Sequence, residues 1–250
     1  SFEETKRFSK LITDYLGRSV NLDPFYGTFP LIENFRQQIA LKKGSYSAAN
    51  RQVLTDVLKL QYEAISYSDA VNENLNLLKN ENTFTITTGH QLSLMTGPLY
   101  FLYKIISIIN LCKRLKNEYP DFDFVPIYWM ASEDHDFEEI SSFRFQNKSI
   151  RWPKETAGAV GEMSLEDLLP VLDIFEQHLG ESINDQQLKD LMKASYRKSK
   201  TLSEATFRLV NLLFGQYGLI VLEPHNPQFD QVRAARLSEA STKIRSARQA

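Results

Sequence analysis

Apolar residues recur at helical spacing through the first eighty residues of the chain. The first such helix is followed directly by Gly17, which is typical of a helix end. A second helix is predicted over residues 31–44, where Lys-Lys-Gly resembles a helix C-terminus, and two more over 53–60 and 72–78. We therefore expect residues 1–82 to form a helical segment that packs on the core. The apolar face of the first helix consists of Phe8, Leu11, Ile12, Tyr15 and Leu16.

From residue 83 onward, the helical pattern gives way to short apolar runs rich in β-branched residues. Strands are predicted at 83–89, 124–132 and 218–224, and the second is apolar throughout, as strands buried on both faces are. Helices are predicted between the strands. One is opened in its first turn by Pro98, and another follows Thr201, where Thr-Leu-Ser-Glu forms a capping box. This alternation predicts a parallel α/β sheet.

The second and third strands are separated by a long segment with a different pattern. The sequence FRFQNKSIRW at 143–152 predicts a β-hairpin, and helices are predicted after Ser164. We interpret residues of about 143–200 as an insertion into a core that covers residues 83–250, rather than as a separate domain.

Composition and charge exclude several classes of protein. The chain has 250 residues, of which 42% are hydrophobic, and a net charge of −2, so no overall field would attract it to nucleic acid or to an anionic membrane. It contains no apolar run long enough for a membrane span and no signal-peptide pattern, so we expect a soluble cytoplasmic protein. Cys112 lies among apolar residues at helical spacing, which favours a buried residue over a nucleophile.

Three of the four histidines follow a predicted strand almost directly. These are His90, His135 and His225, whereas His178 lies near the end of a predicted helix and suits its dipole there. Ligands of open parallel sheets bind at the carboxyl ends of the strands, where the strand order reverses. The three histidines are therefore expected to share a cleft at that edge.

The stretch TTGHQLSLMTGPLY at 87–100 has the composition of a ligand-binding turn. Gly89 permits a tight turn after the strand, and a helix that starts at Gly97 would point free N–H groups at a phosphate or carboxylate. Lys104 would add a positive charge; alternatively, the turn residues only shape a loop and Lys104 extends into solvent. The stretch is neither a P-loop nor a dinucleotide fingerprint. Its candidate anion-binding residues are Thr88, Gly89, Gln91, Thr96, Gly97, Tyr100 and Lys104.

The stretch SEDHDFEE at 132–139 places five carboxylates around His135 directly after a buried strand. Such a run is usually a solvated acidic turn, but its position at a strand end favours function. An acid here could hold a substrate ammonium, or one or two could hold Mg²⁺ with its water shell. A neighbouring carboxylate would raise the pKa of His135 and help it exchange protons. The spacing does not suit zinc. The candidates are Glu133, Asp134, His135 and Asp136.

These two central stretches also carry a family resemblance. The sequences TGHQLSLMTGPLYFLYK at 88–104 and VPIYWMASEDHDFEEI at 125–140 resemble those of the cysteine-adding enzymes of bacillithiol biosynthesis, also called cysteine ligases. The early FEETKRFSKLITDYL and FYGTFPLIENF and the late YGLIVLEPHNP are similar to that family in the same order. The resemblance covers most of residues 1–230.

The resemblance implies a Rossmann-like core with insertions, related in shape to class I synthetases and pantothenate synthetase. It also implies a later coiled-coil region, beyond residue 250, through which the full-length protein forms a homodimer. The implied activity is the last step of bacillithiol biosynthesis, in which cysteine is joined to glucosaminyl malate through an amide bond. A free carboxylate must be activated for this reaction, as an adenylate or an acyl phosphate, so ATP is a candidate co-substrate and Mg²⁺ a candidate metal.

In such a ligase, the candidate residues would have separate roles in proton transfer and substrate binding. His90 or His135 would take the proton from the attacking amine, and Asp134 or Asp136 would pair with the ammonium of cysteine. Gly97 and Lys104 would hold phosphate or malate carboxylates, and Glu133 and His225 would contact substrate. Two rivals are a synthetase that acts on another acid and amine, and a non-catalytic binding or dimerisation module.

Overall fold

The computed structural model describes residues 2–154 and 158–225, and it divides into two compact units between Tyr46 and Ser47. The first unit contains α1 (Lys10–Leu16) and α2 (Phe35–Ser45), connected through two 3-10 turns. Its aromatic centre includes Tyr15, whose ring lies 5.1 Å from that of Phe29, with Arg18 stacked 4.8 Å from the Phe29 centroid. The helical segment expected over 1–82 is thus split, and its first part is a unit of its own.

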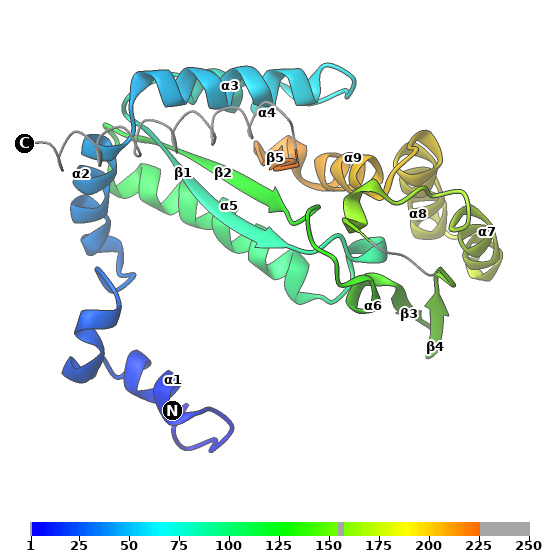
Figure 1. Ribbon diagram of the computed structural model, residues 1–250, viewed down its shortest axis with the longest axis horizontal. Helices are drawn as coiled ribbons and strands as arrows, with labels where there is room; N and C mark the ends of the chain where they lie inside the picture. The colour runs from blue at the N-terminus through cyan, green and yellow to red at the C-terminus, as the bar shows by residue number, and fades with distance from the viewer. Residues whose placement is uncertain (1, 155–157, 226–250) are drawn as a thin grey trace, which may run out of the picture. The chain divides into compact units, whose positions relative to one another are not determined.

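The second unit is built on a parallel sheet of three strands, β1 (Thr83–His90), β2 (Asp123–Met130) and β5 (Ile220–Leu222), in the order β1-β2-β5. Figure 1 shows the β1 and β2 arrows pointing in the same direction. The predicted parallel α/β sheet is therefore confirmed. The three described strands follow one another in the sheet as in the sequence. The expected reversal of strand order at the cleft is not found among them.

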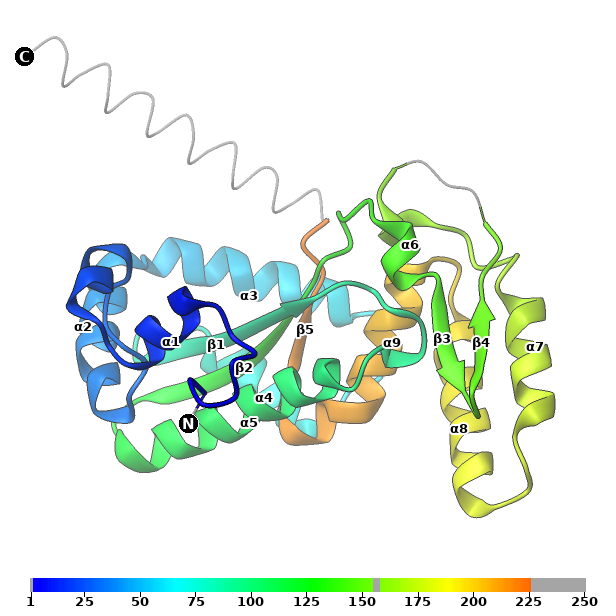
Figure 2. The same ribbon diagram turned by 90° about the horizontal axis from the view of Figure 1, so that it is seen from below.

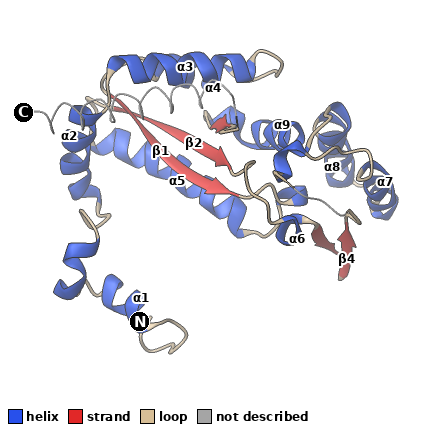
Figure 3. Cartoon of the chain, viewed as in Figure 1, coloured by secondary structure: helices blue, strands red, loops and turns tan. Residues whose placement is uncertain are grey.

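Helices cover both faces of this sheet. The helix α5 (Tyr100–Glu118) packs on β1 and β2, while α3 (Ala48–Tyr62) and α4 (Asp69–Leu77) lie on the opposite side (Figures 1 and 3). The buried stripe of α5 includes Ile105, Ile109 and Cys112, and burial raises the pKa of the Cys112 thiol to about 12. Cys112 is thus the buried apolar residue predicted. The helix begins at Tyr100, two residues later than the predicted start at Pro98, because Gly97 is still in a turn conformation.

The insertion between β2 and β5 contains the predicted hairpin and helices. After α6 (Phe137–Ile140) come the antiparallel strands β3 (Ser142–Phe145) and β4 (Lys148–Arg151), then α7 (Leu169–His178) and α8 (Ile183–Ala194). Figure 2 shows the hairpin beside α7 and α8. Phe143 and Phe145 pack edge-on against Phe175 of α7. The chain then enters α9 (Leu202–Phe214), capped by Thr201 as predicted, and returns to the sheet as β5.

Among the described strands β5 lies at the edge of the sheet, and the end of α3 is hydrogen-bonded to it. The backbone N–H of Val221 donates to the hydroxyl of Tyr62 at 2.9 Å, and two residues later the N–H of Glu223 donates to Oε1 of Gln61 at 3.2 Å. Two adjacent helix residues thus accept hydrogen bonds from the backbone of β5 and of the residue that follows it. In the part of the chain that the structure describes, no helix is long and apolar enough to cross a membrane.

Candidate active site

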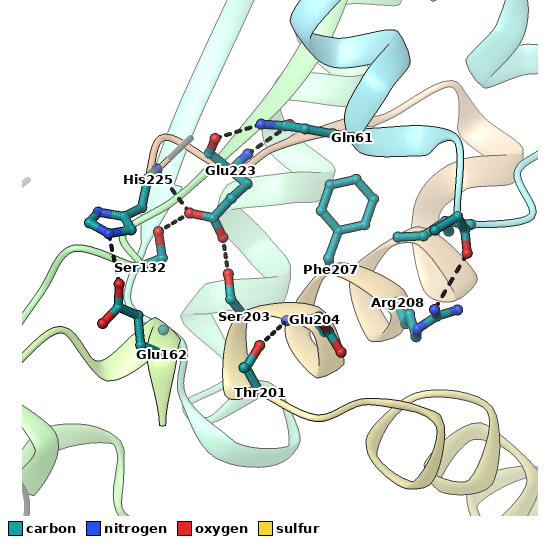
Figure 4. A pocket seen from close by; sticks show the side chains of 13 residues that line it. Gln61, Ser132, Glu162, Thr201, Ser203, Glu204, Phe207, Arg208, Glu223 and His225 are labelled. Carbon is teal, nitrogen blue, oxygen red and sulfur yellow. Dashed lines mark hydrogen bonds and ion pairs between the residues drawn. The ribbon is translucent and has the colours of Figure 1, made fainter. Parts of the chain in front are cut away.

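A pocket of about 410 Å³ opens at the carboxyl ends of β2 and β5 (Figure 4). Its walls come from the end of α3, the first two turns of α9 and the segment around Gly161. Ser132 and Glu223 close its end at the sheet. Its volume lies within the range of small-molecule sites, which commonly form at this edge of a parallel sheet.

Glu223 is a charged group at the sheet end of this pocket. Its carboxylate accepts hydrogen bonds from the hydroxyls of Ser132 and Ser203 and from the backbone N–H of His225 at 3.0 Å. Burial raises the pKa of Glu223, while the Ser132 hydrogen bond opposes the shift. Ser132 lies two residues after the end of β2 and Ser203 lies on α9, so three separate segments of the chain determine where this carboxylate lies.

The backbone of Glu223 is held as firmly as its side chain. The amide of Gln61 donates through Nε2 to the Glu223 carbonyl at 2.7 Å and accepts from the Glu223 N–H through Oε1. This two-way pairing fixes the backbone of Glu223 directly after β5. The position of the carboxylate therefore depends on a residue 162 positions earlier in the sequence.

The segment around Gly161 forms another wall. The Gly161 N–H donates to the Ser132 carbonyl at 3.0 Å, and a Cβ on Gly161 would lie 2.7 Å from the Ser132 Cβ. Only glycine allows this approach. The next residue, Glu162, pairs with Nε2 of His225 at 2.9 Å. His225 is therefore the predicted histidine that the structure places in this pocket.

The far end of the pocket carries a positive charge. Arg208 on α9 is partly buried, and its Nη2 makes a long 3.4 Å bond to the Ala64 carbonyl. Its Nε–H is buried with no hydrogen-bond partner among the described residues. The buried ring of Phe207 lies between Arg208 and Glu223 in Figure 4. Arg208 thus lies across Phe207 from Glu223, and Glu162 and Glu204 add two further carboxylates to the pocket lining.

His90, at the end of β1, lies outside this pocket. Its Nδ1 is 3.0 Å from the Gln91 carbonyl, and because a carbonyl can only accept, Nδ1 carries the proton and Nε2 the lone pair. The ring packs between Tyr100 and Phe101, with centroids 5.0 and 5.3 Å away, and burial lowers the His90 pKa. Burial therefore favours the neutral form of the His90 imidazole.

The acidic turn is organised around Asp134. Its Oδ2 accepts from Nε2 of Gln91 at 2.9 Å, while Oδ1 accepts from the N–H groups of His135 and Asp136 at 2.7 and 3.1 Å. The Gln91 hydrogen bond is the largest cause of its lowered pKa. Asp136 caps α6 through the Glu139 N–H. The His135 side chain is exposed, and Glu133 accepts a 3.4 Å bond from the Trp129 indole.

The expected anion site at the start of α5 has a different structure. Gly97 has φ of +59°, and a Cβ there would lie 2.4 Å from the Cβ of Ser93, so the glycine is needed for packing against its own loop. Lys104 donates through Nζ to the Gly89 carbonyl at 2.6 Å. Met95 and Thr96 also have positive φ, and the Met95 N–H donates to the Tyr196 hydroxyl at 2.9 Å. Thr88 faces Tyr128 in the sheet register.

Gly97 and Lys104 thus have contacts within the fold, while the exposed Lys104 ammonium keeps two further donor positions, so an anion site at this turn stays a prediction. The described residues contain no group of three His, Cys, Asp or Glu side chains that could hold a metal ion. The binding of ATP and Mg²⁺ likewise stays a prediction. His178, at the end of α7, is exposed as expected, and its Nδ1 lies 2.7 Å from the Ile174 carbonyl.

Comparison with known proteins decides the family. The model of the family described as "Bacillithiol biosynthesis BshC, N-terminal Rossmann-like domain" matches residues 1–250. The chain belongs to this family. Proteins named "Putative cysteine ligase BshC" are 52% identical over 223 residues in Flavobacterium johnsoniae and 48% over 226 residues in Christiangramia forsetii. In Bacillus thuringiensis such a protein is 29% identical over 227 residues.

The aligned region is a large part of this chain but a smaller part of its relatives. It covers 89% of the chain and 42% of each of the first two relatives, and 87% and 41% for the Bacillus protein. The chain thus spans about two fifths of the length of these relatives. The resemblance read from the two central motifs and the Rossmann-like core it implied are both confirmed for this BshC-family chain.

Several pocket residues of this BshC-family chain were missed by the sequence reasoning. Glu223 had a usable signal, because it is the first charged residue after the apolar run GLIVL at a strand end. Ser132 and Ser203 had weak signals at the beginning of an acidic turn and within a capping box. Gln61 and Arg208 had none, since each lies on an ordinary helix and reaches the pocket only through the tertiary fold.

Proposed function

We propose that this chain supplies the substrate pocket of a ligase that joins the carboxyl group of cysteine to the amino group of glucosaminyl malate, forming bacillithiol. The observation that carries the proposal is the Glu223 carboxylate, held by two hydroxyls in a pocket at the carboxyl edge of a Rossmann-like sheet. A carboxylate in this setting is suited to bind a substrate ammonium. Membership of the BshC family supports the reaction class.

The reaction forms one C–N bond, between the cysteine carboxyl carbon and the amine nitrogen, and breaks one C–O bond of that carboxyl group. ATP, as co-substrate, would convert the departing oxygen into a leaving group. The amine must lose protons before and during its attack. Glu223 orients the ammonium, and its raised pKa suits it to receive a proton. His90 offers a neutral Nε2 at the same edge of the sheet.

Two further expectations concern the full-length protein: its cellular compartment and its oligomeric state. We expect it to act in the cytoplasm, and we expect the full-length protein to be a homodimer held by a later coiled-coil region, as the family resemblance implies. Light scattering during size-exclusion chromatography of the full-length protein checks the second inference, and a monomer at micromolar concentration would contradict it.

The proposed reaction is tested by incubating full-length protein with glucosaminyl malate, cysteine, ATP and Mg²⁺ and following bacillithiol by mass spectrometry. We expect product only when both substrates and ATP are present, and a large loss with Glu223→Gln. Product from another acid and amine, with none from these two, favours the rival synthetase. No product, together with no thermal shift from any of the three compounds, favours the non-catalytic module. Either result overturns the proposal.

A further inference from the structure

The turn between β1 and α5 has a strained backbone. Met95, Thr96 and Gly97 have φ of +51°, +71° and +59°, so three consecutive residues lie in the left-handed region. Glycine takes this conformation readily, but a β-branched residue such as Thr96 does so rarely. Strain of this kind persists only where surrounding structure enforces it, and it is concentrated at functional sites. The strained pair, Met95 and Thr96, therefore needs support from elsewhere in the chain.

That support comes from the insertion between β2 and β5. The Met95 N–H donates to the hydroxyl of Tyr196, 101 positions later in the sequence, at 2.9 Å. Tyr196 is fully buried and begins a 3-10 turn, Tyr196–Lys198, between α8 and α9. The Ser199 N–H donates to the Tyr196 carbonyl at 3.2 Å, so the backbone at Tyr196 is held as well. Burial raises the pKa of Tyr196 to about 12, and the acceptor is therefore a neutral hydroxyl.

The turn connects His90 to the two rings that pack on it. His90 is the last residue of β1, five positions before Met95. Tyr100 and Phe101 follow the turn, and their ring centroids lie 5.0 and 5.3 Å from that of His90. A change of backbone conformation at Met95 or Thr96 would therefore move the start of α5 relative to the end of β1. The two rings would then shift against the imidazole.

Other hydrogen bonds hold the neighbourhood of the turn without reaching the strained pair from a distance. Lys104 of α5 donates to the Gly89 carbonyl at 2.6 Å, and the Gly97 N–H donates to the Leu94 carbonyl at 2.9 Å within the turn. Among the hydrogen bonds of the described residues, the one from Met95 to Tyr196 ties the strained pair to a distant segment. The Tyr196 hydroxyl is thus well placed to decide the conformation of the turn.

We propose that Tyr196 is a positioning residue of the ligase, whose hydroxyl holds the β1–α5 turn and thereby keeps His90 packed between Tyr100 and Phe101 for proton transfer. This inference rests on the proposed function, in which Nε2 of His90 is available at the carboxyl edge of the sheet. It also gives the insertion of about 143–200 a role in the reaction, because one of its residues supports the end of β1.

The test variant is Tyr196→Phe in the full-length protein, which removes only the hydroxyl. Histidine labelled with ¹³C at ring Cε1 reports on His90 by NMR, and His90→Gln identifies the signal by its loss. Ring currents of Tyr100 and Phe101 shift this signal, so we expect Tyr196→Phe to move it. Turnover should fall about tenfold, which is the worth of one hydrogen bond, while KM for glucosaminyl malate changes less than about threefold.

Tyr62→Phe is the matched control. The Tyr62 hydroxyl is also buried and also accepts a backbone N–H, that of Val221, at 2.9 Å, but it does so at β5, on the other side of β2 from β1. We expect a similar loss of stability with the His90 signal unchanged. A signal that moves equally in both variants would mean general loosening of the fold. A signal that stays in place in Tyr196→Phe would refute the role of the hydroxyl.

A second substitution tests whether the hydroxyl acts through the strained turn. Glycine takes positive φ without strain, so adding Thr96→Gly to Tyr196→Phe should return the His90 signal toward its parental position and recover about threefold in turnover. No recovery would overturn the proposed route. If Tyr196→Phe does not fold, the double variant is compared with Thr96→Gly alone, and the inference then requires that their His90 signals agree.

The outcomes distinguish this inference from the proposed function. If Tyr196→Phe forms bacillithiol at the parental rate, Tyr196 is not a positioning residue and the proposed reaction stands. If the His90 signal moves and recovers as expected but the parent protein forms no bacillithiol under any condition, the support of His90 by Tyr196 stands and the proposed reaction fails. Thermal unfolding of each variant shows that it is folded.

Discussion

Gln91 and Asp134 join the ends of two neighbouring strands: Nε2 of Gln91, directly after β1, donates to Oδ2 of Asp134, beyond the end of β2, at 2.9 Å. The residues are 43 positions apart, and the bond closes the carboxyl edge of the sheet beside His90. It also keeps the Asp134 carboxylate ionised, because hydrogen bonds to the charged form lower its pKa.

The first prediction concerns this bond. Asp134→Asn should lower turnover far more than stability, since Asn can still accept from the two backbone N–H groups and the Gln91 amide can rotate to offer its oxygen. Denaturant unfolding and steady-state rates of the same preparation check it. A loss of unfolding free energy that accounts for the lost activity would show that Asp134 is structural.

The pH dependence of that variant follows from the lowered pKa. A carboxyl group with a lowered folded-state pKa contributes stability above its unfolded pKa, and this contribution is lost as the pH falls through the folded-state value. Any stability advantage of the parent over Asp134→Asn should therefore be present at pH 7 and fade in acid. An advantage that grows on acidification would contradict the cause assigned here.

The second prediction concerns the support of Glu223 by α3. Gln61→Leu removes both hydrogen bonds to the Glu223 backbone and should cost about 1–3 kcal/mol of unfolding free energy. It should also lower the affinity for glucosaminyl malate. Gln52→Leu is the matched control, because Gln52 lies on the same helix and bonds only to exposed Asp56. Equal effects of the two variants on stability and affinity would refute the role of Gln61.

The third prediction concerns Gly97. Gly97→Ala should destabilise the fold by about 1 kcal/mol or more, because φ is +59° and the new Cβ would meet Ser93. Gly44→Ala is the control: a Cβ there meets nothing within 4 Å, and its position within α2 favours alanine. Thermal unfolding of both variants decides the matter. An unchanged Gly97→Ala would show that the turn tolerates a side chain.

The fourth prediction concerns the raised pKa of Glu223. Burial disfavours the charged form, so the stability of this site is greatest below the ordinary glutamate pKa of about 4.3 and decreases as the pH rises through the higher folded-state value. Glu223→Gln should therefore lose less stability than the parent between pH 4 and pH 8. Unfolding curves across this range measure the difference.

Substrate affinity should depend on pH in the opposite direction. Binding of a sugar ammonium needs ionised Glu223, so affinity for glucosaminyl malate should fall on acidification, with a midpoint above the ordinary glutamate value. Glu223→Gln should lack this midpoint. If parent and variant share one pH profile, another group controls binding.

The sequence by itself determined the elements and their class. Helical spacing in α3 and α5, the apolar run of β2 and the Thr201 cap are local patterns, and each is decided by residues within a few positions of one another. For the same reason, the strand ends and the three histidines that follow them could be placed at one edge of the sheet. The two central motifs were sufficient to indicate the family.

Only the tertiary structure decided how that edge is used. Gln61, Ser203 and Arg208 reach the pocket because α3 and α9 pack beside β5, and no local pattern marks a helix residue for such a contact. Gly97 and Lys104 look like ligand groups in the sequence, and the structure adds contacts within the fold, with Ser93 and the Gly89 carbonyl. Glycines in turns and charged side chains suit both ligand binding and contacts within the fold. Their role depends on partners that are distant in sequence, and folding alone brings those partners into contact.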